Sequence, residues 1–453
     1  MPEPDPKLKA GKFKDLLRYL GPGIIVASAS IGNGEIFFAS REGSLFGFSL
    51  LWTFLLCAIM KGSVVYVGSK FATLTGEHPA ARWGQIIPGS KNWVPVFLGI
   101  VAAIAIPSSI CGFIKVLGQW TCWTFGIDTA YTVLCGTIWA LVGFLFVFFS
   151  YEKMEKVSTG IVLILVIFAL LAIFVSNPDW LALLSGFIPT IPAQYPDWVQ
   201  AKNPEVLSGP ILLEIVSAVG ILGGGIQDYL GYMGTISEKN WGMYGNEHIA
   251  DIQASLKRLS GKEDIPLPED KNTVSNAKGW LKAVKIDNVA SFTAVWLVGS
   301  IFMILGNVIL GTNGLQVVPS NDQIIQNQAN FFSVIFMGID EYGEELVLWD
   351  YPIDIIPLFP ALSSINLISI PLIYSQIYQR FKQKKFIYAV LISSAVICFV
   401  AEPLLTFFGY YDLINWHYYE SYPIYVVVTL CTKGIVQKIM YISNKSSCIR
   451  NAG

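Results

Sequence analysis

The sequence predicts an all-α polytopic membrane protein of about ten transmembrane helices, and three observations support this fold class. Of its 453 residues, 53% are hydrophobic and 14% are charged, whereas about a quarter of the residues in a typical soluble protein are charged. Apolar stretches of roughly 20 residues, long enough to cross a bilayer core as a helix, recur along the chain. Lys and Arg concentrate in alternate connections, as cytoplasmic loops do.

The predicted spans follow one another from near the N-terminus to near the C-terminus. The least regular region is 311–353, where the apolar stretch 330–339 is too short to cross a bilayer and could be interfacial or re-entrant. The spans are 20–41, 47–72, 93–115, 129–150, 157–176, 208–236, 286–311, 354–377, 386–408 and 421–442.

The distribution of charge orients these spans. Both termini and every even-numbered connection are basic, whereas residues 311–353 contain several acids and no Lys or Arg. An odd number of spans would place the basic C-terminus outside, so ten spans are favoured, with both termini cytoplasmic and a plasma (cell inner) membrane location. The predicted units are a leader (1–19), a first five-helix repeat (20–176), an extracellular loop (177–207), a second five-helix repeat (208–442) with a cytoplasmic loop (237–285) and an acidic extracellular loop (312–353), and a cytoplasmic tail (443–453).

Glycine interrupts two of the spans. The segments are "SIGNGEIFF" at 30–38 and "SAVGILGGGIQDYLGYMG" at 217–234. Backbone groups freed from a helix at membrane depth must find other partners or line a cavity. Each interruption also ends in an acid, Glu35 or Asp228, and an acid there costs at least about 2.5–3.5 kcal/mol on insertion scales. The predicted helix-break residues are Gly32, Gly34, Gly223, Gly224 and Gly225.

The interruptions fall in the first and sixth of ten spans, which run in opposite directions. This arrangement is typical of a five-plus-five inverted repeat, in which the substrate site lies at mid-membrane between two discontinuous helices. Close helix packing through small residues is the alternative explanation for the glycines. Two acid-bearing interruptions at symmetric places favour a site.

Three segments resemble the Nramp family of divalent metal transporters. Residues 21–52, "GPGIIVASASIGNGEIFFASREGSLFGFSLLW", are similar to the first helix of the family, with its central DPGN, and to the start of the second. Residues 55–76, "LLCAIMKGSVVYVGSKFATLTG", are similar to the second helix, and "AVGILG" (218–223) to the lead into the sixth-helix break. The resemblance implies a LeuT-like inverted-repeat fold with helices 1 and 6 broken.

The same resemblance implies where a metal ion would bind. Family ligands are the Asp and Asn of DPGN, a backbone carbonyl before the sixth-helix motif, and the Met of MPH. The corresponding residues here, in that order, are Gly32, Glu35, Gly224 and Gln227. Asp228 follows where the family has Pro, and Tyr229 replaces the His. The thioether is therefore absent.

Ligand chemistry then favours a hard ion, because carboxylate, amide and carbonyl oxygens suit Mg²⁺, Mn²⁺ or Ca²⁺. Nramp-related magnesium transporters likewise lack the thioether. We expect Mg²⁺ or Mn²⁺ to be bound by Glu35 and Asp228 as charged ligands. The remaining predicted ligands are Gln227, Asn33 and the carbonyls of Gly32 and Gly224, with Tyr229 and Lys61 as possible residues of the surrounding shell.

Other charged residues receive structural interpretations. Lys61, midway along the second span, is expected to neutralise a nearby carboxylate or to set the field near the site. Glu214 and Asp287 lie near span ends and are expected to be interfacial, and Arg41 is expected to lie in the outer vestibule or to extend its charged end toward the interface. Residues 245–260 are expected to form an amphipathic helix on the inner surface.

The predicted function is a secondary transporter that imports a divalent metal ion by alternating access. Proton coupling is doubtful, because Gly32 and Tyr229 replace the acid and the histidine that the family uses. The alternatives are a same-fold transporter of an organic cation or amino acid, and a non-transporting sensor. No enzyme motif, cofactor or nucleic-acid partner is indicated. The partners are the lipid bilayer and the transported cation, and the sequence indicates no oligomeric state.

Overall fold

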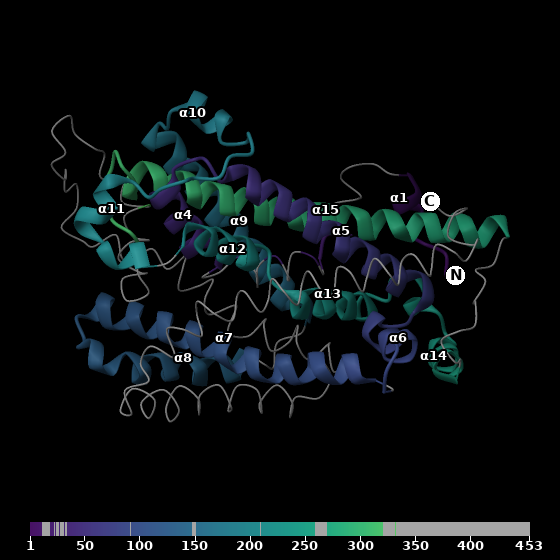
Figure 1. Ribbon diagram of the computed structural model, residues 1–453. Helices are drawn as coiled ribbons and strands as arrows, with labels where there is room; N and C mark the ends of the chain where they lie inside the picture. The colour runs from purple at the N-terminus through teal and green to yellow at the C-terminus, as the bar shows by residue number, and fades with distance from the viewer. Residues whose placement is uncertain are drawn as a thin grey trace.

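The computed structural model describes residues 1–10, 19–21, 23, 27, 31, 34–90, 92–146, 151–208, 210–258, 270–319 and 331, and within these it is helical without strands. Two long helices, α5 and α15, pack side by side along the molecule (Figure 1). The elements are α1 (Pro6–Ala10), η2 (Gly34–Phe38), α4 (Ala39–Phe46), α5 (Leu51–Thr75), α6 (Pro79–Ile86), α7 (Trp93–Phe125), η3 (Thr129–Tyr131), α8 (Thr132–Phe146), α9 (Tyr151–Ser176), α10 (Trp180–Ser185), α11 (Asp197–Lys202), η4 (Pro204–Ser208), α12 (Ile211–Ile221), α13 (Ile226–Glu238), η5 (Gly242–Gly245), α14 (Ile249–Arg258), α15 (Lys271–Leu305) and η6 (Gly306–Leu310).

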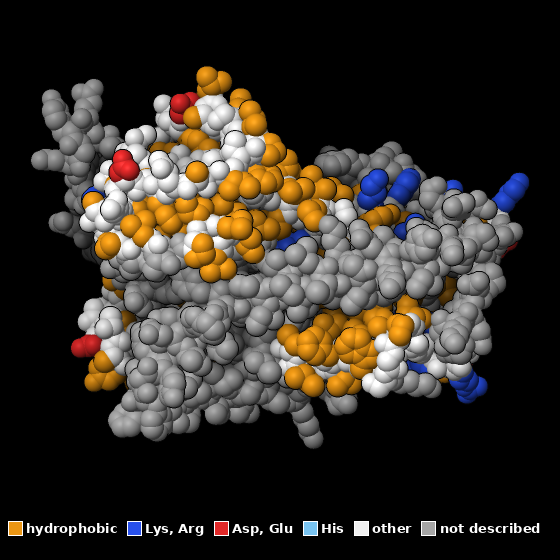
Figure 2. All heavy atoms as spheres, in the orientation of Figure 1, with side chains coloured by type: hydrophobic (Ala, Val, Ile, Leu, Met, Phe, Trp, Pro, Cys, Tyr) orange, Lys and Arg blue, Asp and Glu red, His pale blue; other side chains and the backbone are white. Residues whose placement is uncertain are grey.

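The connections gather at opposite ends of the molecule. Helices α10 and α11, from the loop predicted to be extracellular, lie at one end (Figure 1). Helices α1, α6 and α14, from segments predicted to be cytoplasmic, lie at the other. Figure 2 shows Lys and Arg side chains mostly toward the end that carries α1, α6 and α14. Segments that the charge distribution predicts to lie on opposite sides of a membrane thus lie at opposite ends of the molecule.

Helices α7 and α8 form an antiparallel pair (Figure 1) whose contact depends on small residues. A Cβ on Gly118 would lie 1.9 Å from the Thr132 carbonyl oxygen, and one on Gly136 would lie 2.1 Å from that of Ile114. Glycine at these two positions lets the backbones approach closely, as is common between membrane helices. Gly126, at φ +64°, ends α7.

Several helices extend beyond the predicted membrane spans. Helix α15 begins at Lys271, well before the predicted span start at residue 286. The Asp270 side chain caps this start by accepting a hydrogen bond from the Thr273 N–H at 2.8 Å. Helix α7 continues to Phe125 rather than stopping at 115. Apolar length predicts only the part of a helix that crosses the bilayer, whereas caps determine where the helix ends.

The surface of the described helices is rich in large apolar side chains. Phe97 on α7, Leu141 on α8 and Phe174 on α9 are all exposed, and hydrophobic side chains cover much of the coloured part of the face drawn in Figure 2. By length and composition, α5 and the continuous helix Lys271–Leu310 are each able to cross a membrane. Predicted spans eight to ten lie outside the described residues, so the count of ten stays a prediction.

The turn between α5 and α6 attaches to α13 through the buried side chain of His78. Its Nδ1 accepts a hydrogen bond from the Ala80 N–H at 3.2 Å, so the ring hydrogen lies on Nε2, 3.0 Å from the Leu230 carbonyl oxygen. Burial lowers the pKa of His78, and the bond to Leu230 opposes this shift. The neutral ring therefore fits this site, since both nitrogens are already used.

We expect the melting temperature to fall as the pH drops from about 7.5 to about 5, partly because of His78. Its folded pKa is below the ordinary 6.5, so the unfolded state binds more protons. The stability from the neutral ring is full above the unfolded pKa and is lost as the pH falls through the folded value. His78→Asn keeps a capping oxygen but does not titrate here, so its melting temperature should fall less. An identical pH dependence in wild type and variant would contradict this prediction.

Candidate functional site

The sixth predicted span is interrupted at its glycines. Helix α12 ends at Ile221 and α13 begins at Ile226. Between them, Gly223 and Gly224 have φ of +76° and +72°, in the left-handed region that costs other residues roughly 1–2 kcal/mol each. The nearest atom that a Cβ on Gly223 would meet among the described residues is Val295 Cγ1, at 3.6 Å. The backbone conformation, rather than space, therefore requires glycine at 223.

Asp228 caps the second half of the interrupted helix. It is the third residue of α13, and its Oδ2 accepts a hydrogen bond from the Gly225 N–H at 2.7 Å. A carboxylate at a helix start satisfies an N–H that has no partner within the helix and complements the positive end of the helix dipole. Asp228 thus has a structural role at the interruption, and its role as a metal ligand stays a prediction.

The Gln227 side chain is buried beside the interruption, and its amide lacks hydrogen-bond partners among the described residues. Its side chain is 1% exposed, and neither Oε1 nor Nε2 has a hydrogen-bond partner in the described part of the chain. Buried side-chain polar atoms are normally bonded, and one without a partner costs about 1–3 kcal/mol. The amide is therefore available to a ligand.

The Gly224 carbonyl is already in use. It accepts a hydrogen bond from the Tyr229 hydroxyl at 2.9 Å and another from the Lys61 ammonium at 3.1 Å. Lys61 was expected to neutralise a carboxylate, but the partners identified for it are carbonyls at the end of α12 and in the segment that follows. Tyr229 and Lys61 thus both contact the interruption.

The first interruption is described only from Gly34 onward. Gly32 and Asn33 lie outside the described residues, as does the side chain of Glu35. Residues Gly34–Phe38 form the π-helical turn η2, an irregularity that is frequent at functional sites. This turn packs against α12 and α15. The chain that continues from the first interruption therefore lies against the first half of the sixth span.

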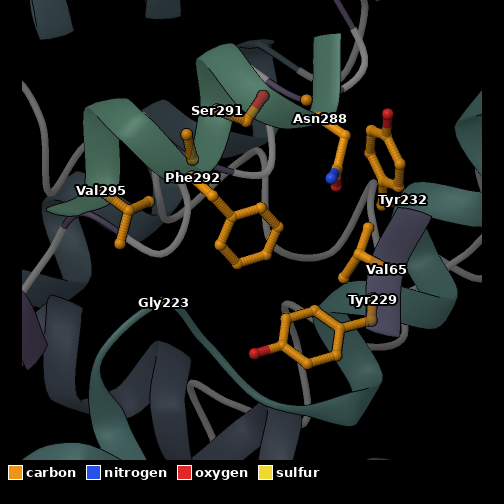
Figure 3. Close-up of a pocket in the computed structure, with 10 residues that line it drawn as sticks. Val65, Gly223, Tyr229, Tyr232, Asn288, Ser291, Phe292 and Val295 are labelled. Carbon is orange, nitrogen blue, oxygen red and sulfur yellow. The ribbon is translucent and has the colours of Figure 1, made fainter. Parts of the chain in front are cut away.

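A small cavity lies on the α13 side of the interruption, with room for about one water molecule. Figure 3 shows the rings of Tyr229 and Phe292 on opposite sides of it, with Gly223 at one end and Asn288 and Tyr232 at the other. Its lining residues are Gly23, Ala27, Val65, Gly223, Tyr229, Tyr232, Asn288, Ser291, Phe292 and Val295. They come from the first, second, sixth and seventh predicted spans, so these helices converge beside the interruption.

Asp287, which was predicted to be interfacial, is a buried junction between helices. Its side chain is fully buried and accepts hydrogen bonds from the Gly21 and Gly23 N–H groups, at 2.9 and 2.8 Å, and from the Tyr232 hydroxyl at 2.8 Å. A Cβ on Gly23 would lie 2.0 Å from Ser291 Oγ. The GPG motif thus brings two N–H groups of the first span to the carboxylate. Hydropathy could not show this, because Gly21 and Gly23 are more than 260 positions from Asp287 in the chain.

A second charged group lies toward the other end of α12. Arg41 on α4 pairs with Glu214 on α12 and donates to the Pro319 carbonyl at 2.9 Å. This pair is largely buried, and the interfacial depth of Glu214 stays a prediction. Glu42 was not singled out by the sequence, because the first span was ended at residue 41. It is fully buried, interacts electrostatically with Arg41 and Glu214, and has no hydrogen-bond partner among the described residues.

Comparisons with known proteins agree with this arrangement. A family model described as "Natural resistance-associated macrophage protein-like" (Nramp) matches residues 23–333. The divalent metal cation transporter MntH of Caldanaerobacter subterraneus subsp. tengcongensis is 22% identical over 310 residues, which are 67% of this chain and 61% of that protein. MntH of Brucella suis biovar 1 is 26% identical over 239 residues, 51% of this chain and 47% of that protein. The chain thus spans less than two thirds of these relatives.

Among solved structures, a manganese transporter of Eremococcus coleocola, crystallised with an aromatic bis-isothiourea substituted compound, has a similar fold. The TM-score is 0.63 at 15% identity, over 95% of this chain and 79% of that one. At this identity the likeness establishes the fold alone. Within the described residues, no group of three or more His, Cys, Asp or Glu side chains is arranged to hold a metal ion. Any metal site therefore needs amide and carbonyl ligands, or residues beyond the described ones.

Proposed function

The chain belongs to the Nramp family, and from this premise we propose that it is a multi-pass membrane transporter, not an enzyme, that carries a divalent metal ion inward by alternating access. The family model covers more than half of the chain. The observation that carries the proposal is the buried, unpartnered amide of Gln227 beside an interrupted helix. Discontinuous helices of this kind hold ions in transporters.

The proposed ligands combine described and undescribed parts of the chain. Gln227 supplies an amide oxygen, Asp228 a carboxylate and Gly224 a carbonyl, while the side chain of Glu35, Asn33 and the Gly32 carbonyl complete the set. Gln227 stands next to the capping residue Asp228, so both reach the ion from the first turn of α13. The packing of η2 against α12 supports an approach of Glu35 to the interruption.

The donor set favours a hard ion. Carboxylate, amide and carbonyl oxygens suit Mg²⁺ and Mn²⁺, and no thioether is among the proposed ligands. The relatives bear the names of divalent metal and manganese transporters, which supports Mn²⁺, whereas the missing thioether supports Mg²⁺. We propose weak or absent proton coupling, since Gly32 and Tyr229 stand at the positions of the family's acid and histidine.

A second candidate substrate is an organic amine. The carbonyls at the end of α12 and just after it already bind one ammonium group, that of Lys61. A free amine presents the same chemistry, three N–H donors on a positive charge. This candidate predicts amine flux in place of metal flux.

We expect proteoliposomes containing the protein to take up Mg²⁺ or Mn²⁺ saturably, without metal-dependent acidification reported by a pH-sensitive dye. Glu35→Ala and Asp228→Ala should abolish binding of the ion in calorimetry, because each removes a charged ligand. Asp251→Ala, which alters an exposed carboxylate on α14, is the control and should bind normally. Absence of saturable flux for Mg²⁺, Mn²⁺ and Ca²⁺ would refute metal transport, and uptake of a labelled amine instead would favour the second candidate.

A further inference from the structure

Lys61 places a positive charge on the carbonyls at the interruption. It lies midway along α5 with 8% of its surface exposed. Its ammonium donates to the Val219 oxygen at 3.3 Å, the Gly220 oxygen at 2.9 Å and the Gly224 oxygen at 3.1 Å, and also to the Leu222 oxygen. Four carbonyl oxygens therefore surround a group with only three N–H donors.

These carbonyls form a site that attracts cations. Val219 and Gly220 belong to the last turn of α12, whose carbonyls have no partner within the helix. The negative end of the helix dipole lies there as well. Leu222 and Gly224 lie in the non-helical segment that follows. In transporters with discontinuous helices, such half-helix ends and unwound carbonyls coordinate the transported cation.

We propose that Lys61 is a tethered competitor of the transported ion: its ammonium occupies the carbonyl site at the end of α12 until the divalent ion displaces it. The inference rests on the proposed function, since it takes Gly224 as a ligand of that ion. Lys61 thereby lowers the affinity of the site for the transported ion.

Lys61 and the metal ion compete because the Gly224 carbonyl oxygen has a limited number of lone pairs. The Gly224 oxygen already accepts from Lys61 and from the Tyr229 hydroxyl, and a carbonyl oxygen has two lone pairs. A metal ion that binds this oxygen must displace one donor. The ammonium is the one that leaves, because it carries a positive charge that a divalent ion repels, whereas the tyrosine hydroxyl is neutral.

The Lys61 side chain is flexible and is not tightly enclosed at Gly223. Even a Cβ on Gly223 would lie 3.7 Å from Lys61 Cδ, which is an ordinary contact distance. Four rotatable methylene groups carry the ammonium, so it can leave the carbonyls without a movement of α5. Displacement therefore needs rotamer changes of one side chain.

The test is calorimetric titration of the full-length protein in detergent with Mg²⁺ and with Mn²⁺. Lys61→Met replaces the ammonium by an apolar chain of similar length and should tighten binding at least tenfold. Lys61→Gln, which keeps two N–H donors and loses the charge, should also tighten it and serves if Lys61→Met does not fold. Lys70→Met, the same change on the same helix, is the matched control and should bind within twofold of wild type.

The outcomes separate the inference from the proposed function. If the Lys61 variants bind the ion more tightly than wild type and Lys70→Met does not, Lys61 is a competitor. The same holds if the Lys61 variants bind the ion and wild type shows no measurable binding. Equal or weaker binding by the variants beside a binding wild type overturns the competitor and leaves metal transport standing. No divalent binding by wild type or by either Lys61 variant refutes the proposed function and the competitor together.

Discussion

Asp287→Ala is expected to destabilise the protein by at least about 3 kcal/mol. The substitution leaves three buried donors without their acceptor, namely the Gly21 and Gly23 N–H groups and the Tyr232 hydroxyl. Each unsatisfied buried donor costs about 1–3 kcal/mol. The methyl group cannot replace the carboxylate, and the site is fully buried. A melting curve in detergent, followed by the loss of monodisperse protein on heating, should shift down by several degrees.

Two further variants test whether the loss of stability depends on the number of hydrogen bonds that the carboxylate loses. Tyr232→Phe removes one of the three donors together with its hydroxyl, so the carboxylate keeps two bonds and the loss should be about 1 kcal/mol. Asp251→Ala removes a carboxylate whose side chain is 87% exposed and should leave the melting temperature unchanged. If Asp287→Ala melted within a degree of wild type, the junction between the first, sixth and seventh helices would not contribute to stability.

The same junction should also affect transport. Asp287 joins the start of the first span to α13, which follows the interruption. Loss of the carboxylate frees the start of the first span from the sixth and seventh spans. For Asp287→Ala we therefore expect a lower flux of the transported ion per folded molecule. Normalising the flux to the amount of monodisperse protein separates this effect from the loss of stability.

Gly43→Ala is expected to cost at least about 3 kcal/mol, because it forces two backbones apart. A Cβ on Gly43 would lie 2.0 Å from the Met303 carbonyl oxygen of α15 and 2.9 Å from the Asn307 nitrogen. Neither atom belongs to a side chain that could rotate away, so α4 or α15 must move. Overpacking of cores costs about 1–3 kcal/mol and occasionally more. A contact between main chains lies at the upper end of this range.

The control is the same substitution in an open place. A Cβ on Gly160, inside α9, would meet no atom of the described residues within 4 Å, and alanine is the better helix former by about 1 kcal/mol. Gly160→Ala should therefore melt at or slightly above the wild-type temperature, while Gly43→Ala melts well below it. Equal melting temperatures for the two variants would show that α4 and α15 do not approach as closely as the structure indicates.

Much of the fold follows from local sequence properties. Apolar length predicted α5, α7, α8 and α9 near their observed places, because burial in lipid requires the same length wherever a helix crosses. The run Gly223 to Gly225 predicted the interruption between α12 and α13, because glycine favours conformations that a helix excludes. Helix α15 begins well before the predicted span, since its first turns are polar and hydropathy predicts only the apolar part of a helix.

The candidate site was predictable only in part. The family resemblance and the glycines directed attention to Gln227 and Asp228, and these lie at the start of α13. The cap that Asp228 provides was not predicted, nor was the burial of Asp287 and Glu42. Lys61 was expected to face a carboxylate, but it lies on carbonyls of α12. The carbonyls that hold Lys61 and the two glycines that bond Asp287 are more than 150 positions away in the chain, so a single sequence contains no local pattern for these contacts.

The sequence by itself determined that this chain is a helical membrane protein with an interrupted sixth span, because composition, apolar length and glycine act locally. Only the tertiary structure decided which groups hydrogen-bond the buried charges. It brings the Asp287 carboxylate to Gly21 and Gly23, and it sets the Lys61 ammonium on the carbonyls after α12. The physical reason is that a buried charge takes whichever donors or acceptors packing brings within reach, and packing joins distant parts of the chain.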